Sequence, residues 1–403
     1  MHKFDPTPSL HPHSRRALER LLDPIEPTVF FNDIYEERFH LIQRDDPDRY
    51  RDLLSVDVID AYLANHVLYD GQIDVTRAEP PISPSDFILD NNEIDRSAVL
   101  RLYQDKATII SPHLHGHHKP LGDFVRALEP VFSASVQTNI YLTPPGAKGF
   151  KTHYDSHDVF VMQVSGAKSW RIYNEPVGKP YRGERFQPGV HDVGEPEAEF
   201  VLYPGDCVYI PRGLMHDADA HENEASLHIT LGLVTRTWAD LVLESISKAA
   251  LETPALRRAL PPGYANPGFD RRKAREQFRA YVTELAAKTE LDEPLDLIAE
   301  DYLRSRAPDL SGVVRHASSA HADEPHYRAQ DNALFRIVEA EPGGDFEVVT
   351  RGGSSEFLGA KRSAFDHAMS GKRFSAADLE GLSKDEALDM IRRLLSRGLI
   401  CPD

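Results

Sequence analysis

Two histidines and one aspartate stand where they could share a metal ion. His153 and Asp155 are two residues apart in a segment of strand-like composition. Both side chains therefore leave the same face of an extended strand, where an imidazole and a carboxylate can occupy neighbouring positions on a metal. His216 follows a short β-branched run and a Pro-Arg-Gly turn, and it is the candidate for a third ligand from elsewhere in the fold.

This set of residue types points to one kind of chemistry. Two histidines and one carboxylate leave three neighbouring positions open on Fe(II). A bidentate co-substrate and dioxygen can then bind together, whereas a four-ligand structural zinc site leaves no open position. An isolated His-x-Asp tripeptide is common and by itself indicates an ordinary strand or loop, so the surrounding sequence has to decide between these interpretations.

The elements around these residues are short and strand-like. Six β-branched or aromatic runs, separated by Pro and Gly turns with no helix between them, cover 136–142, 158–164, 168–173, 199–203, 207–210 and 227–234. This pattern favours an antiparallel sandwich or barrel over a doubly wound sheet. We therefore expect a mainly β core that also carries helical domains.

Helical patterns flank the strand-rich region on both sides. We expect helices over 14–22 and 57–63, and again after residue 235, where apolar side chains recur on one helical face. That face comprises Trp238, Leu241, Val242 and Ile246. Trp170 and Trp238 are both expected to anchor a core. A further helix is expected over 269–289.

The last part of the sequence predicts a third unit. A polar stretch over 311–325 is expected to be a linker, and strands over 334–340 and 346–350 are expected to precede three short helices. The last helix begins with a capping box, Ser383 to Glu386, and Gly398 stands at its stop. We therefore divide the chain into an N-terminal helical lead-in that packs on the core (1–95), the β core (96–235), a helical domain (236–315) and a winged-helix-like domain (316–403).

The composition limits the classes of partner. The chain has 403 residues, 46 Lys and Arg against 64 Asp and Glu, and a formal net charge of −18. This excess argues against direct nucleic-acid binding and suits a basic peptide or protein. Residues 361–403 hold eight basic and seven acidic residues, a poor electrostatic footprint for DNA, so a packing or protein-contact role is expected there.

The same sequence gives an expectation for location. No apolar run is long enough for a membrane helix, and the first residues lack the apolar region of a secretory signal. Only two cysteines occur, Cys207 and Cys401, so a disulfide framework is not expected. We expect a cytoplasmic protein without membrane contacts.

The sequence around the three candidate ligands resembles the JmjC and cupin-type 2-oxoglutarate oxygenases, and within them the ribosomal oxygenases. The similar segments are 139–146, 153–155, 158–163, 166–171, 203–216 and 226–230. The resemblance is strong over 130–235 and looser elsewhere. It implies a double-stranded β-helix that binds Fe(II), 2-oxoglutarate as co-substrate with dioxygen, and a homodimer formed through the helical domain.

The resemblance also implies roles for individual residues. His153, Asp155 and His216 correspond to the iron ligands, and Lys168 corresponds to the basic residue that pairs with the distal carboxylate of 2-oxoglutarate. The hydrogen-bonding residues correspond to Tyr141 and Thr230, with Asn139 beside them near the substrate. Lys168 starts a strand that we expect to run antiparallel to the 158–164 strand. A buried dicarboxylate needs a fixed cation, which a lysine provides.

The activity implied is hydroxylation of a histidine or arginine side chain of a ribosomal protein, with decarboxylation of 2-oxoglutarate to succinate. Within the family, lysine at position 168 is more similar to the histidine-hydroxylating members. Three alternatives stay open: a lysine demethylase on the same scaffold, a hydroxylase of a small molecule or biosynthetic peptide, and a non-catalytic cupin-type binding protein. The intact set of three ligands and Lys168 argues against the last.

Other histidines invite a metal role less strongly. The tract His113–His118 lies ahead of the strands, and we expect it to be mostly solvated. His157 is expected at the wall of the pocket, and Asp158 on the opposite face of its strand. His228 is equally compatible with a pocket position and with a hydrogen-bonded core position.

Overall fold

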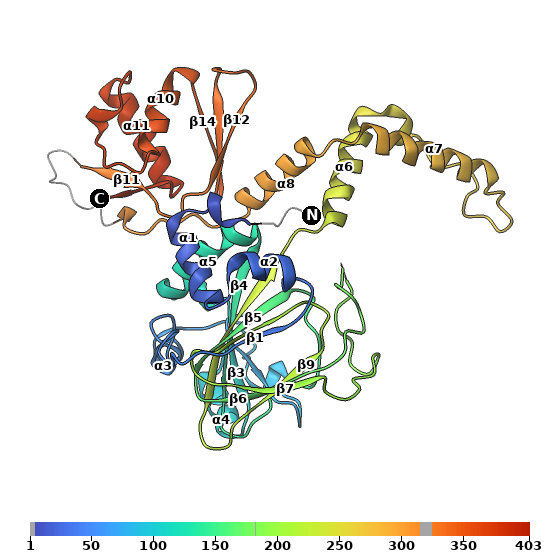
Figure 1. Cartoon of the computed structure of the whole chain (residues 1–403), viewed down its shortest axis with the longest axis vertical. Coiled ribbons are helices and arrows are strands. Elements are labelled where there is room, and N and C mark those ends of the chain that lie inside the picture. Colours follow the sequence, from blue (N-terminus) through green and yellow to red (C-terminus); the bar gives the residue numbers. More distant parts are fainter. Residues whose placement is uncertain (1–4, 182, 315–324) are drawn as a thin grey trace. The chain divides into compact units, whose positions relative to one another are not determined.

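The chain forms two compact units, Met1–Thr235 and Arg236–Asp403 (Figure 1). The structure is a computed structural model that describes residues 5–181, 183–314 and 325–403. In the described residues, no helix is both long and apolar enough to cross a membrane. The predicted linker falls largely on residues 315–324, which lie outside the described part.

The first unit combines helices with two antiparallel sheets. Its helices are α1 (Pro12–Leu22), α2 (Pro27–Asp33), α3 (Val56–Asn65), α4 (Arg96–Gln104) and α5 (Lys119–Phe132). Its strands are β1 (His40–Ile42), β2 (Asp74–Thr76), β3 (Thr108–Pro112), β4 (Ser135–Thr143), β5 (Asp158–Ser165), β6 (Lys168–Ile172), β7 (Ala198–Leu202), β8 (Cys207–Ile210), β9 (His216–Ala220) and β10 (Ser226–Val234). The strand-rich region predicted from the sequence is confirmed.

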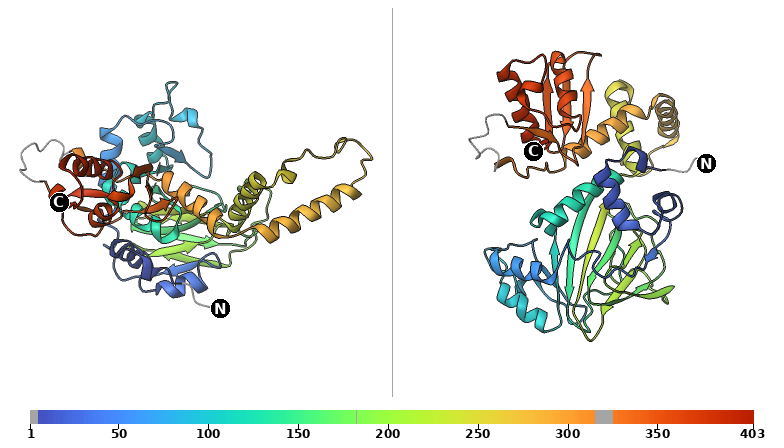
Figure 2. Two further views of the ribbon diagram at one scale, coloured as in Figure 1. Left: turned by 90° about the horizontal axis from the view of Figure 1, so that it is seen from above. Right: turned by 60° about the vertical axis from the view of Figure 1, so that its left-hand side comes forward.

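The larger sheet is buried on both faces. Its strand order is β1-β8-β5-β10-β4-β3-β2, and every neighbouring pair is antiparallel. Along β10, Ile229 and Leu231 belong to the main hydrophobic core, which also contains side chains of α1 and α5. The alternate residues His228 and Thr230 line a pocket on the other face. Helix α5 packs against β4 and α1 (Figure 2).

The smaller sheet has the order β7-β6-β9. Strand β6 follows β5 in the chain but belongs to the other sheet, where it pairs with β7 and β9. The chain changes sheets at Gly166, whose φ is +64° and where a Cβ would lie 2.1 Å from the carbonyl oxygen of Ala225. Only glycine accommodates both the left-handed backbone and this close approach.

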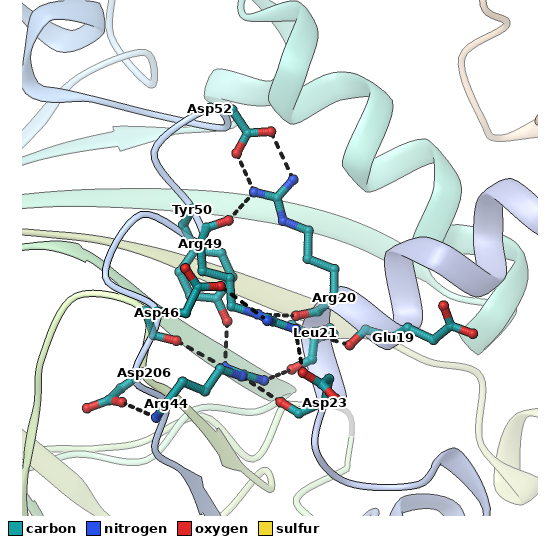
Figure 3. A network of polar contacts seen from close by, with 11 residues as sticks. Glu19, Arg20, Leu21, Asp23, Arg44, Asp46, Arg49, Tyr50, Asp52 and Asp206 are labelled. Atoms are coloured by element: carbon teal, nitrogen blue, oxygen red, sulfur yellow. Dashed lines mark hydrogen bonds and ion pairs between the residues drawn. The ribbon is translucent and has the colours of Figure 1, made fainter.

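Arg44 ties the N-terminal segment to the larger sheet (Figure 3). Its guanidinium donates hydrogen bonds to the carbonyls of Leu21 (2.8 Å) and Asp23 (2.6 Å) at the end of α1. It also donates to the carbonyl of Gly205 at 3.1 Å, and the Arg44 backbone N–H donates to Asp206 at 2.8 Å. One arginine therefore satisfies carbonyls at a helix end and in the turn before β8.

Within the residues that the structure describes, the second unit has three α-helices followed by a mixed α and β region. Its elements are α6 (Trp238–Glu252), α7 (Arg272–Lys288), α8 (Asp292–Arg304), β11 (Tyr327–Ala329), β12 (Phe335–Glu339), β13 (Phe346–Thr350), β14 (Gly353–Phe357), α10 (Arg362–Ala368), α11 (Lys384–Ser396) and β15 (Ile400–Pro402). Strands β12, β13 and β14 form one sheet, and β11 pairs with β15. The predicted capping box is confirmed, since Ser383 and Glu386 bond each other's backbone N–H at the start of α11.

Two expectations for the second unit need correction. The segment after β13 was expected to hold only helices, but Arg351 and Gly352 form a hairpin turn that leads into a third strand, β14. Trp238 was expected to anchor a core, but it is 79% exposed at the start of α6. Helical periodicity predicts an apolar face and does not tell which surface covers it.

Candidate metal centre

His153, Asp155 and His216 come together at one end of the smaller sheet. The backbone N–H of His153 donates to the carbonyl of His216 at 3.1 Å, and the reverse hydrogen bond measures 2.8 Å. One ligand atom from each of the three side chains lies within 4.8 Å of the other two. Among the described residues, this is the group of histidine, cysteine or carboxylate side chains that could hold a metal ion.

The turn before β9 positions His216 beside His153 and Asp155. Its Gly213 has a φ of +89°, and a Cβ there would lie 2.3 Å from the carbonyl oxygen of Val177. The N–H of Gly213 donates to the carbonyl of Asp155 at 2.9 Å, so the turn is fixed directly to the segment that carries the other ligands.

Asp158 holds the same turn from the opposite face of β5. Its carboxylate accepts hydrogen bonds from the backbone N–H of Arg212 (3.1 Å) and from Arg212 Nη1 (2.9 Å). Both side chains are buried, and Glu36 pairs with the same guanidinium at 2.5 Å. Asp158 is therefore engaged away from the three candidate ligands, as strand alternation predicted.

The two imidazoles are oriented by backbone carbonyls. His153 Nδ1 lies 2.9 Å from the carbonyl oxygen of Lys151, and His216 Nδ1 lies 3.0 Å from that of Leu214. A carbonyl only accepts, so each Nδ1 carries a proton, which leaves Nε2 as the nitrogen that can ligate a metal. Burial, with a smaller effect of His153, lowers the pKa of His216 to about 4, which keeps it neutral at pH 7. Neutral imidazoles with a free Nε2 are the form that ligates metal.

A pocket of about 530 Å³, including its open mouth, extends from these ligands between the two sheets. It is lined by Thr108, Tyr141, Gly149, Phe150, His153, Asp155, Val159, Val161, Lys168, Trp170, His216, Asp217, Ala218, His228 and Thr230. The pocket therefore contains the three candidate ligands and three of the four residues expected to bind the co-substrate.

Lys168 is a buried cation in this pocket. Its exposed fraction is 5%, and among the described residues its hydrogen-bond partner is Thr143 Oγ1 at 3.3 Å. Burial lowers the pKa of Lys168 to about 8, and the charge of Asp219 opposes this shift. A buried ammonium without a carboxylate in direct contact suits an anionic ligand, because such a ligand would supply the missing counter-charge.

The other expected co-substrate residues divide into two groups. Tyr141 and Thr230 line the pocket, and the Tyr141 ring stacks on His228 with centroids 4.8 Å apart. Burial, with smaller effects of Asp155 and Asp74, raises the pKa of the Tyr141 hydroxyl, so it is a neutral donor. Asn139 pairs with Thr230 across β4 and β10, but it is not among the lining residues.

Trp170 and His228 add two polar groups that the sequence did not single out for ligand binding. Trp170 Nε1 and His228 Nδ1 are buried and have no hydrogen-bond partner in the part of the chain that the structure describes. Both residues line the pocket. Strand alternation places Trp170 on the face of Lys168, which was a usable signal. Buried polar atoms without partners are rare, so a bound ligand would account for them.

Two expectations about other histidines need correction. His157 does not line the pocket; it packs over Gly232, where a Cβ would lie 2.6 Å from His157 Nε2. The tract His113–His118 was expected to be mostly solvated, and His113 and His117 are exposed, but His115 is half-buried with its Nδ1 3.0 Å from Thr138 Oγ1. Burial, then the nearby His113, lowers the pKa of His115 to about 4. His115 and His157 are half-buried against residues of β4 and β10, which local sequence could not reveal.

Comparisons with known proteins agree with this geometry. Residues 117–241 match the model of the JmjC domain. The chain is 32% identical over 360 residues to the Drosophila melanogaster protein named bifunctional lysine-specific demethylase and histidyl-hydroxylase NO66, covering 81% of this chain and 54% of that protein. It is 30% identical over 323 residues to human ribosomal oxygenase 1, covering 75% of this chain and 49% of that protein. The chain thus spans about half the length of the curated relatives it matches.

Solved structures show the same fold. The Escherichia coli ycfD structure aligns with a TM-score of 0.54 at 15% identity, over 94% of this chain and 98% of that one. A second structure of YcfD, described as a ribosomal oxygenase in complex with cobalt and succinic acid, aligns with a TM-score of 0.51 at 16% identity, over 94% of this chain and 99% of that one. The chain therefore contains a JmjC domain over residues 117–241 and is a homologue of the ribosomal oxygenases.

Proposed function

We propose that this chain is an Fe(II)- and 2-oxoglutarate-dependent oxygenase that hydroxylates a histidine or arginine side chain of a ribosomal protein. Succinate and carbon dioxide are the co-products. One observation carries the proposal: a two-histidine, one-carboxylate set and a buried lysine share a single pocket. The names of the relatives, which include ribosomal oxygenase and histidyl-hydroxylase, support it.

The donor set fits ferrous iron. His153 and His216 each offer an imidazole nitrogen, and Asp155 offers a carboxylate oxygen. When bound, the iron supplies the activation of dioxygen that is coupled to oxidative decarboxylation of 2-oxoglutarate. The protein holds the three ligands in place and surrounds the site with buried side chains that exclude water, among them Val159, Val161 and Trp170.

The pocket's other polar groups fit a dicarboxylate. Lys168 is assigned to the distal carboxylate, with Thr143 beside its ammonium. Tyr141, Thr230, Trp170 and His228 are assigned as further hydrogen-bonding groups around the co-substrate. A cation fixed by burial binds a dicarboxylate with less loss of conformational entropy than a surface lysine does.

We propose a basic ribosomal protein as substrate and a cytoplasmic location. The formal charge of −18 suits a basic partner and disfavours direct binding to nucleic acid. A histidine target is favoured over arginine, because a matched relative is named histidyl-hydroxylase. The family resemblance, in which Lys168 is more similar to the histidine-hydroxylating members, points the same way.

The finer architecture is also a proposal. We assign the two sheets to a double-stranded β-helix, α6–α8 to a helical dimerisation domain and 316–403 to a winged-helix-like domain. The exposed apolar residues Trp238 (79%), Leu251 (75%) and Phe278 (67%) of α6 and α7 support a homodimer, since a monomer would leave them in water.

A lysine demethylase is the second candidate function, because the Drosophila relative's name contains both activities. The chemistry differs only at its end. Hydroxylation of an N-methyl carbon gives a hemiaminal that releases formaldehyde, whereas hydroxylation of a ring or chain carbon leaves the oxygen on the substrate.

The experiment that tests the proposed function is incubation of the purified chain with Fe(II), 2-oxoglutarate and ribosomal proteins from cells that lack it. We expect succinate formation and a gain of one oxygen on a single ribosomal peptide by mass spectrometry. Formaldehyde release from a methylated peptide, without such a gain, would favour the demethylase. Absence of both products, with every ribosomal protein tested, would contradict the proposal.

A further inference from the structure

A buried carboxylate next to the candidate metal centre joins the segments that carry its histidines. Asp217 follows His216 on β9, and its side chain is 2% exposed. It accepts hydrogen bonds from Thr152 Oγ1 at 2.6 Å and from Tyr173 OH at 3.0 Å. Arg171 Nε donates to it at 2.7 Å, and Lys148 Nζ lies 3.2 Å away.

These partners come from separate parts of the chain. Lys148 and Thr152 belong to the segment that precedes His153, Arg171 belongs to β6, and Tyr173 follows β6 directly. Asp217 is thus the point at which β9, β6 and the His153 segment are tied together.

The contact with Thr152 bears directly on the orientation of His153. The imidazole of His153 is oriented by the carbonyl of Lys151, and Thr152 is the residue between them. Fixing the Thr152 side chain therefore fixes the peptide that aims His153. Asp217 is also the residue that directly follows His216 in the chain. Holding the Asp217 carboxylate in place therefore constrains the backbone of both His153 and His216.

We propose that Asp217 is a positioning residue that sets His153 against His216 and so preorganises the site for metal. This inference rests on the proposed metal-binding function. Asp217 is not one of the three ligands, because its oxygens are engaged by Thr152, Tyr173, Arg171 and Lys148. Groups that hold metal ligands in place change metal affinity by roughly 10- to 100-fold when they are altered.

The test is a titration of metal-free protein with Co(II), followed by the visible absorption of the bound ion, for Asp217→Asn and Thr152→Val. Asp217→Asn keeps the shape but loses the charge, and Thr152→Val removes one hydrogen bond. We expect Co(II) binding to weaken about 10-fold or more for Asp217→Asn, with a changed spectrum, and to weaken less for Thr152→Val.

Asp219→Asn is the matched control. Asp219 stands two residues along the same strand and also pairs with Arg171 and, at 3.9 Å, with Lys148. It is not tied to Thr152 or Tyr173 among the contacts of the described residues, so its variant should bind Co(II) as the wild type does.

The outcomes distinguish failure of the positioning role of Asp217 from failure of the proposed metal-binding function. Wild-type affinity and spectrum in both Asp217→Asn and Thr152→Val would overturn the positioning role, as would equal losses in Asp219→Asn and Asp217→Asn. If Asp217→Asn lowers Tm too far to be titrated, Thr152→Val decides alone, and unchanged binding there overturns the role. A wild-type protein that does not bind Co(II) would instead overturn the proposed function.

Discussion

The larger sheet buries its apolar residues, whereas helices α6 and α7 leave theirs partly or largely exposed. Seven of the eight residues of β5 are buried, and so are eight of the nine residues of β10. In α7, by contrast, no residue is buried, and in α6 the buried residue is Ser245. Both regions have apolar sequence patterns, yet only the sheet buries its pattern within the described chain.

The difference has a physical origin. A strand satisfies its backbone hydrogen bonds only beside other strands, so forming the sheet brings its side chains under cover. A helix satisfies its backbone internally and can expose an apolar face until a partner covers it. The two sheets thus enclose the pocket that contains the three candidate ligands, whereas helices α6 and α7 present an exposed apolar surface that supports the proposed homodimer.

The site within the sheets should fail completely when a ligand is lost. His216→Ala removes one of three metal ligands, so we expect iron-dependent succinate formation to fall below detection while the circular dichroism spectrum is kept. His221→Ala is the matched control, because His221 bonds Ser169 outside the pocket. Full turnover in His216→Ala would remove this residue from the metal site.

A pair of identical substitutions measures the contrast in burial directly. Leu231→Ala in β10 removes a fully buried side chain and should lower the free energy of unfolding by about 2–5 kcal/mol. Leu243→Ala in α6 alters a side chain that is 45% exposed, so the free energy of unfolding should change by less than about 0.5 kcal/mol. Denaturant unfolding of both variants is the measurement, and equal losses would contradict the comparison.

The buried lysine should control the co-substrate rather than the metal. Lys168→Ala removes a charge-assisted hydrogen bond, so the KM for 2-oxoglutarate should rise roughly ten- to hundredfold. Co(II) affinity should stay within about twofold. A KM that hardly changes would show that Lys168 does not bind the distal carboxylate.

Co-substrate affinity should also depend on pH with a defined sign. Burial, opposed by Asp219, lowers the pKa of Lys168 to about 8, so its positive charge is present below pH 8 and is lost as the pH rises through 8. The affinity for 2-oxoglutarate, measured by calorimetry between pH 6.5 and 9.5, should therefore fall at the alkaline end. Lys168→Arg keeps its charge throughout and should not show this fall. Identical profiles for the two proteins would assign the pH dependence to another group.

The helical surface should respond in assembly and hardly in stability. Trp238→Ala removes a side chain that is 79% exposed in the single chain, so the free energy of unfolding measured on dilute protein should change by less than about 0.5 kcal/mol. Light scattering should show the proposed dimer weakened. A monomeric wild-type protein would contradict the role of this face, and so would a variant that dimerises as strongly as the wild type.

Much of the fold near the site could be predicted from local sequence. The strands β4, β5, β8 and β10 were expected within one or two residues of their observed bounds. The capping box at Ser383 could also be predicted, because a capping box involves residues that are close together in the chain. The sheet to which β6 belongs could not be predicted from local sequence, because strand pairing depends on distant segments. It also depends on the change of sheet that the chain makes at Gly166.

The site residues also divide into those that local sequence could predict and those that it could not. The spacing of His153 and Asp155, together with a histidine after a Pro-Arg-Gly turn, was enough to nominate the three candidate ligands. The sequence did not reveal that Trp170 and His228, which line the pocket, have buried polar atoms without a partner among the described residues. Nor did it reveal that Asp217 accepts hydrogen bonds from separate segments. These arrangements depend on residues far apart in the chain.

By itself, the sequence determined which residue types stand at which spacing, and hence the strands, the caps and the chemistry that the site could support. Only the tertiary structure decided the surroundings of each side chain: Trp170 lines the pocket and Trp238 is exposed to solvent. Lys168 is buried and has no carboxylate partner among the described residues. The reason is that local backbone preference acts over a few residues, whereas burial and charge pairing are set by segments brought together from across the chain.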